Sequence, residues 1–242
     1  MMHQLRYGES ETLQLDVPPD TLVADCTQVP GPLLEDPAPA ATAALLNPTH
    51  FPPLPQAVVP GDRVVIALDP DVPQAGAVVA GVVQALLAAA VPPDHITVLQ
   101  ACGHDRAEQL SAQLPTGARQ VQFAVHDPRD AEQLAYLAAS KDAAPIHLNR
   151  LLCDADLVLP INLLRPDTAL LYTGPHSGLC PTYSDAETQL RFRTPNAIAP
   201  RAQQRRRREE ADEVAWLLGI QLSLQVIAGA GDTVLHVLAG MD

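Results

Sequence analysis

GDRVVIALDPDVPQAG (61–76) is the stretch of sequence that decides the fold. Its first part, 63–68, is Arg63 followed by a short continuous apolar run, as in a strand that is buried on both faces. The Pro-Gln pair at 73–74 opens an apolar helical segment that runs to about Ala90, where two prolines end it. HITVLQ (95–100) follows as a second strand. Strand, helix and strand at this spacing predict a right-handed crossover between parallel strands.

The same alternation continues towards the C-terminus, so the expected fold class is α/β: a Rossmann-like, mainly parallel sheet flanked by helices. The glycine fingerprint of dinucleotide-binding proteins does not follow the first strand, which argues against a dinucleotide site. Residues 134–137 fit neither a helix nor a strand decisively. The remaining expected elements are helices at 106–114 and 202–218, a helical turn at 150–155, and strands at 120–125, 146–149, 156–161, 220–227 and 233–238.

The N-terminal 60 residues have a different character. Residues 4–17 hold two alternating stretches around Gly8-Glu9-Ser10, which predicts a hairpin. Between 30 and 60 lie 9 of the 24 prolines, which predicts an extended surface connection. A short helix is expected inside it at 40–46, capped by Asp36. We therefore expect two units, namely this hairpin and Pro-rich extension packing on the main domain (1–60), and the α/β domain itself (61–242).

Composition excludes several classes of protein. The chain has 242 residues and a formal net charge of −13, with 47% hydrophobic and 18% charged residues, so it is not a disordered polypeptide. The acidic balance argues against nucleic-acid binding, and we interpret the one basic run, 205–208, as a solvated helix face beside acidic residues. No apolar run is long enough to cross a membrane and no signal peptide opens the sequence, and the four cysteines lack a disulfide or CxxC pattern. We expect a cytoplasmic protein with reduced thiols.

Polar residues follow the predicted strands, where open α/β sheets bind ligands. His104 stands between a glycine and a predicted helix, where an imidazole can exchange protons near neutral pH. The same histidine could equally be a helix-start residue satisfied by Asp105 or by the backbone, and both interpretations stay open. Asp69 could bind a cation or a hydroxyl, but an Asp-Pro turn is the favoured interpretation, as it is for Asp127.

The loop 173–181 is rich in glycine, and Gly174 and Gly178 would let the backbone approach an anion closely. His176 and Cys180 could supply two ligands to a soft metal, but no spacing of a known closed site supports this. The sequence also lacks the nucleophile elbow of serine hydrolases and the phosphate-binding P-loop.

Six segments of the chain form a pattern when they are taken in order. They are PGDRVVIALDPDVP (60–73), ITVLQACGHDR (96–106), VHDP (125–128), IHLNRLLCDADLVLP (146–160), LYTGPHSGLCP (171–181) and the C-terminal GAGDTVLHVLAGMD. Together they resemble the N-terminal domain of the nickel-dependent lactate racemase family. The resemblance implies a two-domain protein with its active site between the domains. There, a nickel pincer nucleotide accepts hydride from a 2-hydroxy acid, and two histidines take the hydroxyl proton.

The resemblance also assigns roles by position. The first catalytic histidine falls on His104. The aspartate that opens the family's Asp-x-Thr-Arg-Pro loop falls on Asp69, while its threonine and arginine positions hold Asp71 and Val72. Valine cannot make the bidentate contact by which arginine holds a carboxylate. By this resemblance, the sequence keeps one catalytic histidine and lacks the arginine that would bind the substrate carboxylate.

Counting without gaps from Asp156, the second catalytic histidine falls on Asp167 and the lysine that tethers the cofactor falls on Ser177. The histidine that ligates nickel falls on Arg193, and a guanidinium cannot replace an imidazole on a metal. His176, beside the lost lysine, is the one remaining candidate for a metal ligand. The positions expected to contact substrate or cofactor are Asp69, Asp71, Gly174 and Ser177.

Two functions follow from this resemblance. The first is a pseudoenzyme, which as a single chain has no racemase activity, does not bind the nickel pincer nucleotide and acts as a binding or partner subunit. The second is a diverged 2-hydroxy acid racemase or epimerase that uses the nickel cofactor, with His104 and Asp167 as its acid/base pair, and that needs a second domain. The expected partner is a separate chain with the second domain or another copy of this chain, and a small 2-hydroxy acid is the possible ligand.

Overall fold

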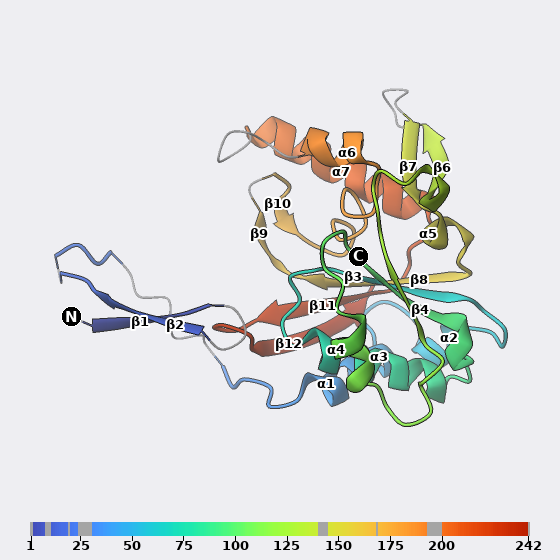
Figure 1. Ribbon diagram of the computed structural model, residues 1–242, viewed down its shortest axis with the longest axis horizontal. Helices are drawn as coiled ribbons and strands as arrows, with labels where there is room; N and C mark the ends of the chain where they lie inside the picture. Colours follow the sequence, from blue (N-terminus) through green and yellow to red (C-terminus); the bar gives the residue numbers. More distant parts are fainter. Residues whose placement is uncertain are drawn as a thin grey trace.

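The computed structural model describes residues 2–7, 11–18, 20–23, 31–139, 145–167, 169–192 and 200–241. Within them, the central sheet has the strand order β12-β11-β8-β3-β4-β5 (Figure 1). All neighbours in it are parallel except β11 and β12, which pair antiparallel. This confirms the predicted α/β class. The strands are β3 (Val64–Leu68), β4 (Ile96–Gln100), β5 (Gln122–Val125), β8 (Leu157–Leu163), β11 (Ser223–Ala228) and β12 (Val234–Gly240).

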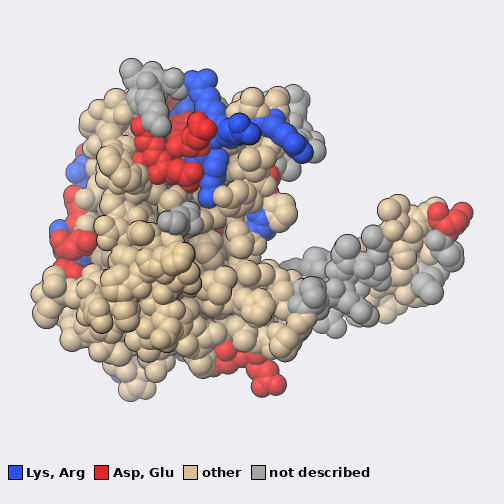
Figure 2. Space-filling view, turned by 180° about the vertical axis from the view of Figure 1, so that it is seen from behind, with Lys and Arg blue, Asp and Glu red and all other residues tan. Residues whose placement is uncertain are grey.

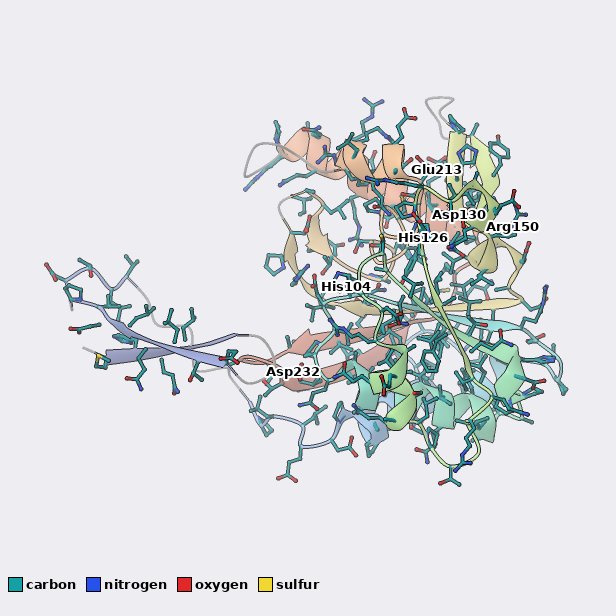
Figure 3. All side chains as sticks on the ribbon, in the orientation of Figure 1. His104, His126, Asp130, Arg150, Glu213 and Asp232 are labelled. Carbon is teal, nitrogen blue, oxygen red and sulfur yellow. The ribbon has the colours of Figure 1, made fainter. Side chains whose placement is uncertain are left out.

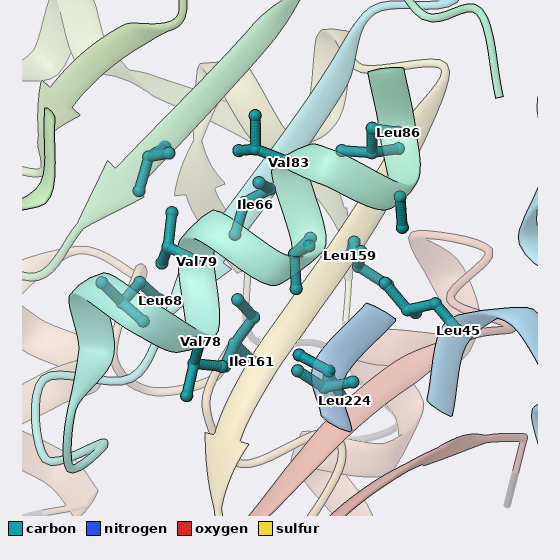
Figure 4. Close-up of a cluster of buried hydrophobic side chains, with 14 of the residues drawn as sticks. Leu45, Ile66, Leu68, Val78, Val79, Val83, Leu86, Leu159, Ile161 and Leu224 are labelled. Carbon is teal, nitrogen blue, oxygen red and sulfur yellow. The ribbon is translucent and has the colours of Figure 1, made fainter. Parts of the chain in front are cut away.

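Helices cover both faces of this sheet (Figure 1). Alternate residues of β3 explain why, because Val64 and Ile66 pack into one apolar cluster while Val65 and Ala67 pack into another. Figure 4 shows the first cluster, in which Ile66 lies against the central helix α3. On this face lie α1 (Pro37–Leu46), α2 (Leu54–Ala57), α3 (Ala75–Ala88) and α4 (Ala107–Ala112), and on the other α5 (Arg150–Asp154), α6 (Ala186–Phe192) and α7 (Arg201–Leu217).

The proline-rich segment contributes to the core. Asp36 caps α1 by accepting a hydrogen bond from the amide of Ala38, which confirms the predicted cap. Ala41 and Leu45 of this helix are fully buried in the cluster around α3. The short helix expected at 40–46 is thus present as α1, which starts at Pro37, and its apolar residues have a helical spacing that lets them pack on the sheet domain.

The N-terminal hairpin is formed by β1 (Met2–Tyr7) and β2 (Glu11–Asp16), which pair antiparallel. The turn predicted at Gly8-Glu9-Ser10 lies outside the described residues. Figure 1 shows the hairpin projecting away from the sheet domain, and every residue of β2 is exposed. The strand β2 therefore presents no buried face, and a short two-stranded ribbon depends on such a face for stability.

Further short elements stand on the α7 side of the sheet. The strand predicted at 146–149 is β7 (Pro145–Asn149), which pairs antiparallel with β6 (Leu134–Ala139) outside the central sheet. The undecided residues 134–137 thus belong to a strand. A further ribbon, β9 (Arg165–Asp167) with β10 (Leu171–Thr173), was not expected from the sequence. Single turns of 3-10 helix precede β4 at Pro93–His95 and β6 at Ala131–Gln133.

The basic run in α7 is not a solvated face throughout. Arg207 and Arg208 are buried, with guanidinium carbons 5.8 Å from the ring centre of Phe192 and 4.2 Å from that of Tyr172. Figure 2 shows basic side chains beside acidic ones in this region. The interpretation as a solvated face is wrong for these two arginines, because their guanidinium groups pack on aromatic rings and donate to backbone carbonyl groups. Among the described residues, no helix has the length and apolarity needed to cross a membrane.

Candidate functional site

A cavity of about 840 Å³ opens at the carboxyl ends of β3, β4 and β5, where the loops after these strands meet the segment 165–192. This is the edge at which open α/β sheets bind ligands. The cavity gathers residues that are far apart in sequence, including five of the site residues expected from the sequence. Its titratable side chains are Asp69, Asp71, Cys102, His104, Asp127, Arg129, Arg165 and Asp167.

His104 is half-buried in the wall of this cavity, and Figure 3 shows it on the loop that follows β4. Gly103 before it has a φ of +79°, a backbone conformation that favours glycine, and the His104 amide donates to the carbonyl of Ala101 at 3.1 Å. Among the described residues, the carboxylate of Asp105 accepts the amide of Ala107 and makes no hydrogen bond with the imidazole. The imidazole therefore remains accessible to a ligand in the cavity.

Asp69 ties the ends of two neighbouring strands together. Its Oδ1 accepts the amide of Asp71 at 2.9 Å and its Oδ2 accepts the amide of Leu163, at the end of β8, at 3.2 Å. Burial raises the pKa of the Asp69 carboxyl group, although these two amides act in the opposite direction. Asp69 is thus the turn residue that the sequence favoured, and it also links β3 to β8 at the cavity edge.

In the rest of the loop after β3, one side chain points into the apolar core and another faces the cavity. Val72, at the position of the family's arginine, is 3% exposed and belongs to the apolar core. Asp71 faces the cavity, and its Oδ2 forms an ion pair with Nη2 of Arg165. Arg106 steadies the loop by donating to the carbonyl of Pro70 at 3.1 Å. The structure therefore brings a guanidinium to this loop from β9 and not from the loop itself.

Asp167 begins the turn between β9 and β10. Its Oδ1 accepts the amides of Ala169 and Leu170, both at 2.7 Å, so one carboxylate oxygen is used to shape the turn. Asp167 also lines the same cavity as His104. The two residues expected as an acid/base pair are thus brought to one cavity.

Ser177, at the position of the tethering lysine, closes its own loop. Its Oγ accepts the amide of Gly174 at 2.9 Å and donates to the carbonyl of Gly174 at 3.1 Å, and the side chain is buried. A Cβ on Gly174 would lie 2.7 Å from Nη2 of Arg208, so this position accepts only glycine without a shift of the arginine. The loop is therefore held by contacts within the protein.

The imidazole of His176 faces the carboxylate of Asp212. Its Nδ1 lies 2.9 Å from Oδ1 of Asp212, and the same oxygen lies 3.3 Å from Nε of Arg208. Cys180 is buried, and burial raises the pKa of its thiol. In the part of the chain that the structure describes, no group of three or more His, Cys, Asp and Glu side chains is placed to hold a metal ion. The described residues therefore form no metal site around His176 and Cys180.

Two arginines of the site were missed in the sequence. Arg165 and Arg129 contribute guanidinium groups to the cavity. Arg165 lies on β9, which is too short to show a periodicity, and Arg129 lies in the turn after β5. His126 follows β5 but is fully buried and hydrogen-bonded to Ser184, so it takes part in packing. An arginine beside a turn that was not predicted has no sequence pattern that marks it as part of a site.

These residues do not fit the nickel pincer nucleotide that the resemblance implies. Serine has no amine that could form the lysine tether, and the hydroxyl of Ser177 is bonded to Gly174 on both sides. Val72 points into the core. The chain's one lysine, Lys141, and Arg193 lie outside the described residues. The described donor set therefore offers neither the tether nor the carboxylate clamp.

Comparison with solved structures agrees with this fold. The lactate racemase apoprotein from Thermoanaerobacterium thermosaccharolyticum matches with a TM-score of 0.69 and 18% sequence identity, over 100% of this chain and 59% of that chain. A crystal structure of a protein from Thermotoga maritima matches with a TM-score of 0.56 and 19% identity, over 73% of this chain and 49% of that chain. At such identities the likeness shows the fold alone. The chain spans less than two thirds of the length of either structure.

No curated protein matches this chain. The family described as the lactate racemase N-terminal domain matches residues 7–196, which include the cavity loops, His104 and Ser177. Because this match covers most of the sequence, the chain belongs to the lactate racemase N-terminal domain family.

Proposed function

We propose that this chain is a binding subunit of the lactate racemase family that does not racemise 2-hydroxy acids on its own. Its ligand site is the His104 cavity, which binds a small polar molecule. The observation that carries this proposal is that the Ser177 hydroxyl is hydrogen-bonded to Gly174 within its own loop. A side chain that is held in this way cannot anchor a cofactor. The cavity itself supports a retained binding role, since its imidazole is accessible.

The partner in this proposal is a separate chain that carries a second domain. Apolar side chains at the cavity and on the hairpin support it, because large exposed apolar surfaces on soluble proteins commonly mark interaction sites. Leu190 lines the cavity and is 69% exposed, and Leu5 and Leu13 of the hairpin are each 46% exposed. The match covers 59% of the lactate racemase apoprotein, and the remaining 41% leaves room for such a domain in the relative.

A second candidate function is a diverged racemase or epimerase whose second domain comes from another chain. One observation favours it, namely that His104 and Asp167 line the same cavity. An imidazole and a carboxylate on one cavity could exchange the hydroxyl proton of a bound 2-hydroxy acid. Asp167 keeps one oxygen free of the backbone amides that its Oδ1 accepts. This candidate requires a hydride acceptor in addition to these two residues.

A racemisation assay tests the proposal. The purified full chain is incubated with L-lactate, with and without added nickel, and the enantiomers are separated by chiral chromatography. We expect no D-lactate, no nickel after purification by elemental analysis, and an intact mass equal to that of the unmodified chain. Racemisation that is lost in His104→Ala and kept in His95→Ala, a change outside the cavity, would overturn the proposal and favour the diverged enzyme.

A further inference from the structure

One face of α7 reaches solvent along nearly the whole helix. The opposite face is buried on the domain through residues such as Ala211, Val214 and Ala215. The outward residues lie three or four positions apart, which is the spacing at which side chains of an α-helix share a face. We call this face the α7 stripe, and it consists of Ala202, Arg205, Arg206, Glu209, Glu213 and Trp216. The described residues that line the His104 cavity include none from α7, so the stripe is a separate surface.

The charges of the α7 stripe follow an unusual order. Its two arginines come first and its two glutamates follow, and the first turn of the helix adds Arg201 but no acidic residue. A helix has a partial positive charge at its N-terminus, and a glutamate that precedes a basic residue by four positions stabilises a helix better than the reverse order. The order found here is therefore the less favourable one for the helix itself, and stabilisation of α7 does not explain it.

The α7 stripe also has groups without partners in the described part of the chain. There, Arg205, Glu209 and Glu213 form no ion pair, whereas Arg208 pairs with Asp212 beside the stripe. Figure 2 shows acidic and basic side chains in adjoining groups on this side of the molecule.

Trp216 at the C-terminal end of the stripe is the chain's one tryptophan, and it is 77% exposed. Tryptophan and arginine are the residue types that contribute most to binding at protein interfaces. A large exposed indole beside charges of both signs is therefore typical of a surface that another protein covers.

We infer that a second copy of this chain docks on the α7 stripe, with the two α7 helices antiparallel about a two-fold axis at Glu209. Arg205 and Glu213 are each four residues from Glu209, so Arg205 of one copy faces Glu213 of the other. Ala202 and Trp216 are each seven residues away, so the indole meets a small side chain that leaves room for it. In a closed two-fold interface every such contact occurs twice.

The arrangement also accommodates the charge on the axis. The two Glu209 carboxylates approach each other there, and Arg205 and Arg206 of both copies lie within about one helical turn of them along the axis. Antiparallel helices place the positive end of each helix dipole beside the negative end of the other. The order of charges that is unfavourable within one helix is thus favourable between two.

A second copy fits the α7 stripe better than a nucleic acid does. Glu209 and Glu213 lie on the same face as the arginines and would repel phosphate groups, and the whole chain has a net charge of −13. The stripe carries two positive and two negative side chains, so it is complementary to itself, as a contact between identical surfaces must be. This inference does not depend on the proposed function, because it concerns a different surface.

The fluorescence of Trp216 tests the inference on the full chain, since no other tryptophan contributes. One helix of 17 residues is about 25 Å long, so the interface is small and the dimer is weak. We expect the emission to shift to shorter wavelengths as the concentration rises from about 1 to 500 µM, while sedimentation velocity shows a dimer. Raising the salt concentration to about 1 M should weaken both changes. An emission maximum that does not move with concentration would overturn the inference.

Charge exchange tests the antiparallel arrangement. Arg205→Glu and Glu213→Arg each place like charges opposite each other twice, so each should weaken the dimer about tenfold or more. The double variant Arg205→Glu/Glu213→Arg restores both pairs with the signs exchanged, and its affinity should return to within about threefold of the wild type. The two positions are about 12 Å apart along one helix, so this recovery cannot arise within one chain.

Arg119→Glu is the matched control for Arg205→Glu. Arg119 is exposed in the turn before β5, and its replacement changes the net charge by the same amount. It should leave the dimer unchanged, and circular dichroism should show that all variants are folded. Equal weakening in Arg119→Glu, or no recovery in the double variant, would overturn the inference.

Two other outcomes would also overturn it. A dimer that is indifferent to salt and to both single variants would be formed elsewhere, for example through the exposed leucines of the hairpin, which stands apart from α7 (Figure 1). The other outcome concerns a labelled 20-base-pair DNA duplex. Binding of this duplex by a monomeric wild type, lost in Arg205→Glu and not regained in the double variant, would assign the arginines to a polyanion.

Discussion

The imidazole of His126 lies against the carbonyl oxygen of Ser184, with 2.9 Å between Nε2 and that oxygen. On the other side of the ring, Nδ1 lies 3.0 Å from Nδ2 of Asn149, and an amide nitrogen can only donate. These partners assign the proton to Nε2 and leave the imidazole neutral. His126 thus joins the end of β5 to the segment that forms the far wall of the cavity, and its edge contacts the ring of Tyr183.

This arrangement predicts a loss of stability in mild acid. Burial lowers the pKa of His126 below its ordinary value of 6.5. As the pH falls below 6.5, the unfolded chain takes up a proton at this histidine before the folded chain does. The free energy of unfolding therefore falls with decreasing pH in this range and is fully present above it. Urea denaturation at a series of pH values from 5 to 8 measures this slope.

The control for this prediction is a second histidine. In His126→Gln the slope near pH 6 should largely disappear, while the variant itself should be less stable by about 1–3 kcal/mol because Ser184 or Asn149 loses a partner. His236 is exposed on β12, so His236→Gln should keep the wild-type slope. A slope that persists in His126→Gln would assign the acid sensitivity to other groups.

A close contact in the cavity loop gives the next prediction. A Cβ built on Gly178 would lie 1.5 Å from Oδ1 of Asn162, which is fully buried in β8 and donates through Nδ2 to the carbonyl of Pro175 at 2.7 Å. Gly178→Ala should therefore destabilise the protein by about 1–3 kcal/mol or displace the loop. Thermal unfolding followed by circular dichroism measures the change.

Shortening the opposing side chain tests the cause. In the double variant Gly178→Ala/Asn162→Ala, the added methyl group has room. The double variant should therefore lose less stability than the sum of the losses in the two single variants. Strict additivity would mean that Gly178 is required for its backbone and not for its contact with Asn162.

The central part of the fold could be predicted because its elements are long enough to show a pattern. The apolar run at 64–68 and the helix Ala75–Ala88 contribute side chains to the same core cluster, so local sequence and tertiary structure agree. The sequence did not reveal β9, β10 or α6, which are short and depend on contacts with distant residues such as Thr173 with Leu163. Such contacts leave no periodicity.

The candidate site likewise has a part that the sequence predicted and a part that it did not. His104 and Asp69 follow predicted strands, and the rule that ligands bind at the carboxyl ends of a parallel sheet places both at one edge. Arg165 reaches this edge from a ribbon that no pattern predicts. The burial of Arg208 depends on the ring of Tyr172 and the carbonyl of the same residue, contacts that only the folded chain creates.

The start of α3 is held by a residue far away in sequence, which gives a further prediction. Oδ1 of Asp232, in the turn between β11 and β12, accepts the amide of Gln74 at 2.8 Å, and the Gln74 side chain donates back to the Asp232 carbonyl. Asp232→Ala should cost about 1 kcal/mol of unfolding free energy, as the loss of one hydrogen bond at a helix start does. Asp232→Asn keeps the acceptor oxygen and should cost less in the same urea titration. Equal losses would show that the contribution comes from the negative charge.

The hairpin gives the last prediction, since its two faces differ. Leu5 and Leu13 are directly opposite each other on one face, and Gln4 and Gln14 are directly opposite on the other. All four are exposed, so the pair of leucines leaves an apolar surface uncovered in the isolated chain. We expect the isolated chain to self-associate through this face as its concentration rises, and light scattering coupled to size-exclusion chromatography measures the molar mass.

In Leu5→Ser/Leu13→Ser this self-association should be lost, because the change removes the apolar surface that association would bury. Gln4→Ser/Gln14→Ser is the matched control and should associate like the wild type. Neither pair contacts the apolar core clusters, so both variants should unfold within about 0.5 kcal/mol of the wild type. A wild-type chain that stays monomeric at every concentration, or equal behaviour of the two double variants, would show that the leucine face is not an interaction surface between copies.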